Sequence, residues 1–270
     1  MAPRRRRSTT TVVDRSKVAS RVAKKIMLAS ERPQRFRVLI YGRSGAGKTR
    51  LACTAPNPLL IDINEEGWDS VRKEPHNPNT IEVKFWSELT DIYWFLQEGD
   101  HAFDSVILDG LTAMQDLAVR FVLGDETSRD ASRDPDMMDR RLWGKVGELM
   151  KTQITNYRNL PMNVIYTATE RKTAVGDEDD EQEIYIGPAL TPAAAGAAER
   201  AVPLIGYLHK RQVNVKRKGQ KKRERIVRRR LLIDDPADRY QTKDRYHFGA
   251  PYIDAPDISQ MIEFISKEAE

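Results

Sequence analysis

The chain has 270 residues, of which 40% are hydrophobic and 31% are charged, and its formal net charge is +5. This length accommodates one α/β domain with appendages, and no apolar run approaches the about 18 residues that span a membrane. The single cysteine, Cys53, excludes an intramolecular disulfide and a cysteine-rich zinc site, so we expect a reducing, cytoplasmic setting. The four histidines are scattered without metal-ligand spacing.

The N-terminal 35 residues are predicted to precede the core domain. Residues 1–15 are basic and lack the apolar period of a folded element, so we expect a disordered tail. An Arg- and Ser-rich, acid-poor start also resembles a mitochondrial transit peptide, but a short arm that touches nucleic acid explains the same charges. Residues 16–35 are predicted to form a short amphipathic helix, over 16–30, and a linker.

A strand followed by a glycine-rich loop begins the core domain, which we assign to residues 36–270. Arg37–Tyr41 has the apolar character of a buried strand, and a helix is expected after Thr49. Between them lies the pattern G-x-x-x-x-G-K-T, formed by Gly42, Arg43, Ser44, Gly45, Ala46, Gly47, Lys48 and Thr49. Its glycines let backbone N–H groups point at phosphate oxygens, Lys48 would reach the β- and γ-phosphates, and Thr49 would offer its hydroxyl to Mg²⁺. The sequence therefore predicts a P-loop that binds ATP with Mg²⁺.

Strands and helices alternate over the next 120 or so residues. Strands are predicted at 59–63, 81–85, 103–109 and 164–168, and helices at 87–99 with Ser87 as the cap, at 111–123 and at 137–159. Residues 124–136 are polar and are predicted to form a mobile loop. This alternation predicts an α/β fold with a mostly parallel sheet that has helices on both faces.

Carboxylates near the ends of these strands are candidates for metal binding and catalysis, because ligands bind at the carboxyl ends of parallel strands. Asp109 fits a Walker B aspartate that keeps Mg²⁺ beside Thr49. Asp62 is the rival, but it lies only thirteen residues after Thr49, which leaves little room for a crossover helix. Glu65 and Glu66 could polarise the attacking water, or they could be exposed loop residues.

Beyond the fifth strand the pattern changes to a basic hairpin. An acidic run at 176–183 is predicted to be a solvated loop, a helix is predicted at 193–201, and a strand at 204–208. Residues 210–230 hold twelve Lys/Arg and one acid, a net charge of +11 that leaves −6 for the rest of the chain. Strand patterns on both sides of the basic tip predict a β-hairpin over 210–233, and the final helix is expected from about Asp257.

This charge predicts contact with the backbone of a nucleic acid, through Lys210, Arg211, Lys216, Arg217, Lys218, Lys221, Lys222 and Arg223. The hairpin lacks interleaved aromatic residues, so backbone contact is better supported than base stacking. The alternative is a solvated edge hairpin whose lysines protect it from aggregation.

Taken together, these motifs resemble the phage-encoded RecA-like ATPases that consist of a core domain only, the single-strand-annealing recombinases of tailed phages. The resemblance covers about 36–245, and its most specific pieces are residues 59–67, 103–110, 164–168 and 242–245. It implies a P-loop NTPase fold of the RecA-like type and a location in the cytoplasm of a bacterial host cell. The chain departs from RecA in having Thr169 and Glu170 where RecA has a glutamine that senses the γ-phosphate.

The resemblance also implies a function and roles for individual residues. We expect an ATP-dependent, single-stranded-DNA-binding recombination ATPase that forms homo-oligomers on DNA, with a single-strand-binding protein as a further partner. Glu65 takes the role of the catalytic glutamate beside Lys48 and Asp109, while Lys243 and Arg245 become cationic fingers that act on a neighbour's nucleotide. Two alternatives stay open: an annealing module that uses nucleotide only structurally, and a helicase-loader or motor-type ATPase that acts on a protein partner.

Overall fold

The structure, a computed structural model, describes residues 15–28, 31–63, 66–73, 77–130, 134, 137–175, 183–215 and 224–267. The chain divides into two compact units, residues 1–34 and 35–268. Apart from Arg15, the predicted basic tail lies outside the described residues. The first unit contains helix α1 (Arg15–Ala23), which is shorter than the predicted 16–30. A turn at Lys24 and Lys25 ends it, and a helix of this length has little intrinsic stability.

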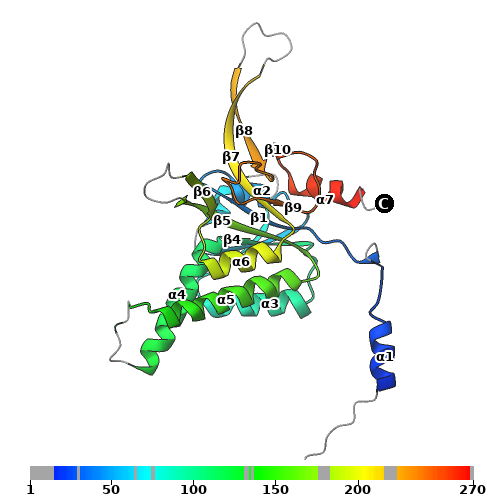
Figure 1. The fold of residues 1–270 in the computed structure, drawn as a ribbon, viewed down its shortest axis with the longest axis vertical. Helices are drawn as coiled ribbons and strands as arrows, with labels where there is room; N and C mark the ends of the chain where they lie inside the picture. The colour runs from blue at the N-terminus through cyan, green and yellow to red at the C-terminus, as the bar shows by residue number, and fades with distance from the viewer. Residues whose placement is uncertain are drawn as a thin grey trace, which may run out of the picture. The chain divides into compact units, whose positions relative to one another are not determined.

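The second unit is built on a ten-stranded mixed sheet (Figure 1). Its parallel part has the order β7-β1-β5-β4-β2-β3, formed by β1 (Arg37–Gly42), β2 (Pro58–Ile63), β3 (Asn79–Val83), β4 (Ser105–Asp109), β5 (Asn163–Val175) and β7 (Leu204–Val215). Antiparallel strands extend it: β6 (Glu183–Pro188) on β5, β8 (Glu224–Leu232) and β9 (Lys243–Asp244) on β7, and β10 (Tyr252–Asp254) on β8. One strand separates the P-loop strand β1 from β4, an order consistent with the RecA-like type of P-loop fold.

Helices cover both faces of this sheet (Figure 1). One face packs on α3 (Trp86–Glu98), α4 (Leu111–Arg129), α5 (Arg140–Asn159) and α6 (Pro192–Ala201), and the other on α2 (Lys48–Ala52) and α7 (Ile258–Lys267). Alternate residues of β1 serve the two layers, since Leu39 packs towards α3–α6 and Ile40 towards α2 and α7. Burial on both faces explains why the parallel strands are nearly continuous apolar runs. The predicted fold class is confirmed.

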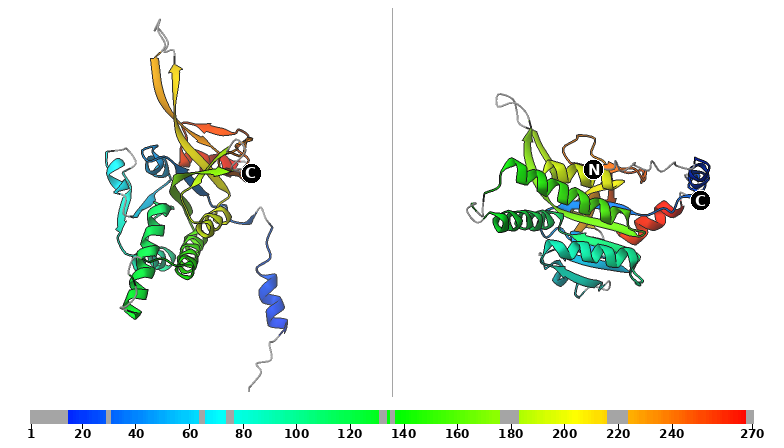
Figure 2. Two further views of the ribbon diagram at one scale, coloured as in Figure 1. Left: turned by 60° about the vertical axis from the view of Figure 1, so that its left-hand side comes forward. Right: turned by 90° about the horizontal axis from the view of Figure 1, so that it is seen from below.

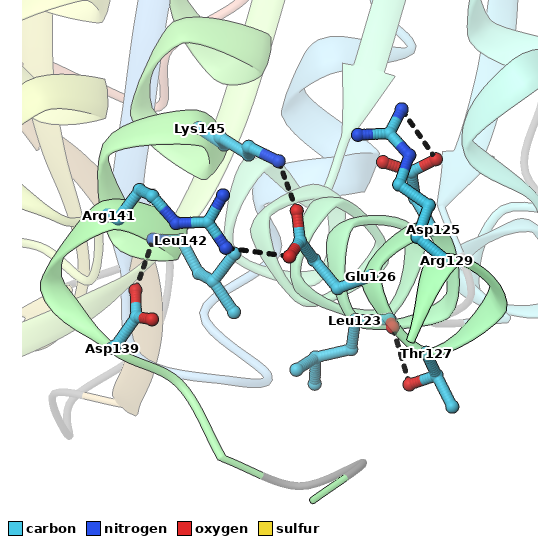
Figure 3. Close-up of polar contacts among 9 residues, drawn as sticks. All are labelled: Leu123, Asp125, Glu126, Thr127, Arg129, Asp139, Arg141, Leu142 and Lys145. Carbon is cyan, nitrogen blue, oxygen red and sulfur yellow. Dashed lines mark hydrogen bonds and ion pairs between the residues drawn. The ribbon is translucent and has the colours of Figure 1, made fainter. Parts of the chain in front are cut away.

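Two helix boundaries differ from prediction. Helix α4 continues six residues past Leu123, into the predicted loop, because Glu126 on it forms ion pairs with α5 (Figure 3). The predicted cap Ser87 is wrong: α3 begins at Trp86, and the Glu88 carboxylate accepts hydrogen bonds from the backbone N–H groups of Lys84 and Phe85, both at 2.8 Å. A glutamate in the first turn thus satisfies the backbone N–H groups at the start of the helix, which is one half of a capping box.

The C-terminal third contains more strand than predicted. Strand β5 continues to Val175 and pairs with β6, which was not predicted, while residues 176–182 of the acidic run lie outside the described residues. The predicted hairpin is confirmed, with β7 and β8 paired from Tyr207 and Leu232 outwards, and Figure 2 shows it projecting beyond the sheet. The strand expected at 204–208 and the first arm of the predicted hairpin form one continuous strand. No helix in the described part of the chain combines the length and apolar character that crossing a membrane requires.

Candidate nucleotide-binding site

The glycine-rich loop between β1 and α2 has the backbone conformation that its residues predict. Gly45 and Gly47 have φ values of 71° and 100°, in the left-handed region that favours glycine. The Lys48 Nζ donates to the carbonyl oxygens of Gly42 and Arg43, at 3.1 and 3.3 Å. The ammonium group therefore lies back across the loop, as phosphate binding requires.

Asp109 lies at the end of β4 with its carboxylate fixed by two hydroxyl groups. The Thr49 hydroxyl donates to Oδ2 at 2.7 Å, and the Thr167 hydroxyl donates to Oδ1 at 2.6 Å. Burial raises the pKa of Asp109, and the two hydrogen bonds oppose this rise. Within the described part of the chain, no lysine or arginine forms an ion pair with it. A buried carboxylate whose hydrogen bonds come from hydroxyl groups is suited to receiving a cation.

The rival aspartate, Asp62, has a different position and different contacts. It is buried beside Asp109, its register partner on the neighbouring strand. Its Oδ2 accepts a hydrogen bond from the backbone N–H of Trp68 at 3.1 Å. Because Asp109 contacts Thr49 directly, the geometry favours Asp109 as the Walker B aspartate.

The segment after β2 approaches the Asp109 carboxylate closely. A Cβ on Gly67 would lie 2.4 Å from Asp109 Oδ2, so only a glycine fits without displacing the acid. Neither Gly67 nor Thr167 was among the predicted site residues. The sequence held a signal for Gly67, because it directly follows Glu65 and Glu66. Thr167 could be found only with the knowledge that β4 and β5 are neighbours.

A cavity of about 440 Å³ joins these groups, lined by Ser44, Gly45, Gly47, Lys48, Thr49, Arg50, Glu66, Gly67, Ser70, Asp109, Lys210 and Arg229. The loop around Gly47 and the acid at the end of β4 therefore share one cavity. Glu66 contributes to its lining, while Glu65, the predicted catalytic glutamate, lies outside the described residues.

The residues around Asp109 fit Mg²⁺. This ion takes oxygen ligands and keeps several waters, usually binding one or two protein groups plus substrate phosphates. Thr49 and Asp109 would hold it from the protein side, since Thr49 Oγ1 and Asp109 Oδ2 are 2.7 Å apart. Among the described residues there is no cluster of three or more His, Cys, Asp or Glu that could hold a metal. A site completed by phosphates and water needs no such cluster.

Two of the eight predicted nucleic-acid contacts are described. Lys210 and Arg211 lie exposed on β7, where Lys210 is opposite Arg229 and Arg211 is opposite Arg228. The other six lie outside the described residues: Lys216, Arg217, Lys218, Lys221, Lys222 and Arg223.

The two predicted finger residues have different surroundings. The Lys243 Nζ donates to the carbonyl oxygens of Glu199 and Val202, at 2.6 and 2.8 Å, and burial lowers its pKa. Lys243 therefore satisfies carbonyls at the C-terminus of α6 in its own chain, a role that was not predicted. Arg245 is exposed, and its role as a finger stays a prediction.

Thr169 and Glu170 lie in the middle of β5, where Thr169 is the register partner of Gly42 at the start of the P-loop. The Thr169 hydroxyl is 3.0 Å from the Thr112 hydroxyl. The Glu170 carboxylate accepts a hydrogen bond from the Tyr207 hydroxyl at 2.8 Å and lies 3.6 Å from Nε of Arg43. These contacts link the P-loop to β5 and β7.

One comparison with known proteins, the match to a family model, bears on this site. The model of the AAA domain family matches residues 34–246. No curated protein matches the chain. Among solved structures, the chain is similar to the flagellar accessory protein FlaH from Methanocaldococcus jannaschii, with 10% identity, a TM-score of 0.35, and coverage of 77% of this chain and 79% of that one. Because the family match spans most of the chain and includes the P-loop, Thr49 and Asp109, the chain belongs to the AAA domain family of P-loop ATPases.

Proposed function

We propose that this ATPase binds Mg²⁺-ATP beside the P-loop and single-stranded DNA along the β7–β8 hairpin, as a phage recombination or annealing ATPase would. The observation that carries the proposal is that the base of the basic hairpin lines the nucleotide cavity, through Lys210 and Arg229. One structural element thus belongs both to the cavity and to the most basic surface predicted from the sequence.

The residues of the cavity have different roles in hydrolysis. Lys48 and the amide groups of the loop bind and orient the phosphates, and Mg²⁺, when held by Thr49 and Asp109, supplies charge neutralisation. A glutamate after β2 orients the attacking water. Glu65 is assigned this role on the family resemblance, with Glu66 at the cavity wall as the neighbouring candidate.

The hairpin supplies the DNA-binding surface. Its described cations lie along two paired strands, and the sequence places six more between these strands, which suits the regularly spaced phosphates of an extended strand. Backbone contact of this kind does not depend on base sequence. Because exchange or annealing of strands needs several subunits on one DNA, the proposal includes a homo-oligomer, in which Arg245 reaches a neighbour's nucleotide.

The primary test is ATP hydrolysis titrated with single-stranded and double-stranded DNA, for the wild-type protein, Lys48→Ala and Glu65→Ala. We expect stimulation by single-stranded DNA, loss of nucleotide binding in Lys48→Ala, and binding without hydrolysis in Glu65→Ala. Strand annealing that is undiminished in both variants would instead indicate an annealing module that uses nucleotide only structurally. No hydrolysis by the wild-type protein under any of these conditions contradicts the proposal.

A second test addresses the partner. Replacing Lys216, Lys218, Lys221 and Lys222 with serine should weaken single-stranded DNA binding and reduce the slope of log affinity against log salt by about 0.7 for each phosphate that the variant no longer neutralises. A control for the loss of positive charge is Lys24→Ser with Lys25→Ser, which removes two cations of the first unit, outside the hairpin, and is compared with the pair Lys221→Ser and Lys222→Ser. Unchanged DNA affinity and salt slope in the hairpin variant would favour a motor-type ATPase that acts on a protein partner.

A further inference from the structure

The hairpin presents different cations on its two faces. Residues directly opposite each other in an antiparallel pair share a face, and successive residues alternate between faces. Lys210 and Arg229 are opposite each other and therefore share one face, while the opposed pair Arg211 and Arg228 occupies the other. Only the first pair lines the nucleotide cavity among the hairpin residues that the structure describes.

Arg229 is in direct contact with the P-loop. Its Nε donates to the carbonyl oxygen of Ala46 at 3.1 Å. A Cβ on Gly47 would lie 2.3 Å from Arg229 Nε and 3.0 Å from Nη2, so the guanidinium occupies the space directly over that glycine. The glycine before Lys48 thus has a second function in this chain, because it admits the arginine as well as curving the loop.

The register of the sheet fixes this contact. Strand β7 is the parallel neighbour of the P-loop strand β1, with Tyr207 opposite Tyr41. A Cβ on Gly42 would lie 2.4 Å from the carbonyl oxygen of Leu208, so the start of the P-loop and the base of the hairpin approach at backbone distance. Lys210 and Arg229 therefore reach the P-loop from β7 and β8, which are paired strands of the same sheet, and not from a loop.

The chemistry of these two cations suits a triphosphate. A guanidinium presents its N–H donors as a planar fork that binds phosphate oxygens in a bidentate manner, whereas an ammonium acts as a point charge. A partly buried cavity strengthens both interactions relative to water. With Lys48 on the loop and two cations on the hairpin, the cavity has positive charge on both sides of the position of the phosphates.

We propose that Arg229, assisted by Lys210, is a phosphate-binding residue of the nucleotide site, supplied in cis by the basic hairpin, and that it links nucleotide binding to polyanion binding on the same hairpin. The inference rests on the proposed function and adds to it the residue through which the two ligands communicate. Because linkage is reciprocal, a triphosphate that changes the affinity for single-stranded DNA is itself bound more or less tightly, by the same factor, when DNA is present.

The test compares two adjacent arginines on opposite faces of one strand. Arg229→Gln and the matched control Arg228→Gln remove the same charge from neighbouring positions, and the affinity of each variant for a fluorescent ATP analogue is measured without DNA. Since a charge-assisted hydrogen bond to phosphate is lost, we expect Arg229→Gln to weaken binding about tenfold or more. Arg228→Gln should stay within about twofold of the wild-type protein, because its face of the strand does not line the cavity.

A second variant and a second readout guard against misfolding. Arg229→Lys keeps the charge but loses the fork, so its affinity should lie between those of the wild-type protein and Arg229→Gln, with an unchanged melting temperature. The ratio of single-stranded DNA affinities with and without the ATP analogue should differ from one in the wild-type protein and in Arg228→Gln, and should approach one in Arg229→Gln.

The outcomes separate this inference from the proposed function. Equal affinities of folded Arg229→Gln and Arg228→Gln, in a protein whose wild type binds the analogue, would overturn the inference alone. If the wild-type protein binds no nucleotide, the proposed function fails and the inference fails with it.

Discussion

Two buried acids of this protein, Asp109 and Glu126, have their charges satisfied in opposite ways. Both are nearly inaccessible, with exposed fractions of 2% and 8%. Asp109 receives hydrogen bonds from the hydroxyls of Thr49 and Thr167, and burial raises its pKa. Glu126 lies between Lys145 and Arg141 of the next helix, and these two partners lower its pKa to about 2 (Figure 3).

The difference indicates that the two acids have different functions. A carboxylate that already has two cations of its own chain connects α4 to α5 and has no need of a ligand. A carboxylate whose hydrogen bonds come from neutral hydroxyl groups, with no ion pair to a lysine or arginine among the described residues, can still be stabilised by a metal ion. We therefore expect changes around Asp109 to affect nucleotide binding with little effect on folding, and changes around Glu126 to do the reverse.

The largest effect is expected from Gly67→Ala. The added Cβ would lie 2.4 Å from Asp109 Oδ2, and two hydrogen bonds prevent the carboxylate from moving away freely. We expect ATP hydrolysis to fall at least about tenfold, which corresponds to ~1.4 kcal/mol of transition-state stabilisation. The measurement is steady-state hydrolysis together with circular dichroism to verify folding.

Gly124→Ala is the matched control for this substitution, because nothing lies within 4 Å of a Cβ added there, on α4. Alanine in the helix should leave hydrolysis unchanged and stabilise the fold by up to about 1 kcal/mol. Hydrolysis by Gly67→Ala at the wild-type rate would contradict the assigned position of the segment after β2.

Glu126→Gln tests the other member of the comparison. We expect a lower unfolding temperature at neutral pH with unchanged nucleotide affinity, because the ion pairs to Lys145 and Arg141 are lost. Glu148→Gln, which removes an exposed pair with Lys151, should cost much less.

The stability that Glu126 contributes should depend on pH. The folded-state pKa of Glu126 is depressed from its ordinary 4.5 to about 2, so its contribution is fully present above pH 4.5 and is lost as the pH falls towards 2. The unfolding midpoints of the wild-type protein and Glu126→Gln should therefore converge over this range in pH-dependent unfolding experiments. A constant difference down to pH 2 would mean that the ion pairs do not form.

Lys243→Met and Arg245→Gln separate a structural cation from a candidate finger. Lys243 satisfies two carbonyl oxygens at the end of α6, so its loss should destabilise the fold by about 1 kcal/mol in urea unfolding. Arg245 is exposed, so Arg245→Gln should leave stability unchanged and lower hydrolysis only in the assembled protein on DNA. A loss of assembled activity in Lys243→Met at unchanged stability would restore Lys243 as a finger.

The smallest effect is expected at Cys53, which lies near Asp109 but is buried. Burial raises the pKa of its thiol to about 12, so little thiolate is present at neutral pH. We expect alkylation to be slow in the native protein and rapid in urea, with nucleotide binding unaffected by the reagent. Rapid alkylation of the native protein would contradict the burial of this thiol.

The parts of the site that could be predicted from the sequence are those in which neighbouring residues carry the chemistry. Lys48, Thr49 and Asp109 were found because a contiguous loop and a strand end specify their positions. Thr167 and Arg229 were missed as site residues because their contacts depend on strand pairing, between β4 and β5 and between β7 and β8. Their residue types alone do not distinguish them from many other threonines and arginines.

The fold was predictable to a similar degree and for a similar reason. Apolar runs located the parallel strands, since burial on both faces leaves a strong local signal. The extension of α4 was missed because its reason, Glu126, has its partners 15 and 19 residues further along the chain. The length of β5 and the existence of β6 likewise depend on a partner strand and not on local pattern.

The continuity of β7 has a mechanical consequence. The seven residues from His209 to Val215 continue the strand past its buried half, which at about 3.3 Å per residue makes an arm of about 23 Å. A tilt of about 10° where this arm leaves the sheet would displace its far end by about 4 Å, given that rise. Any change of angle at the base of this arm is therefore amplified along its length towards Val215.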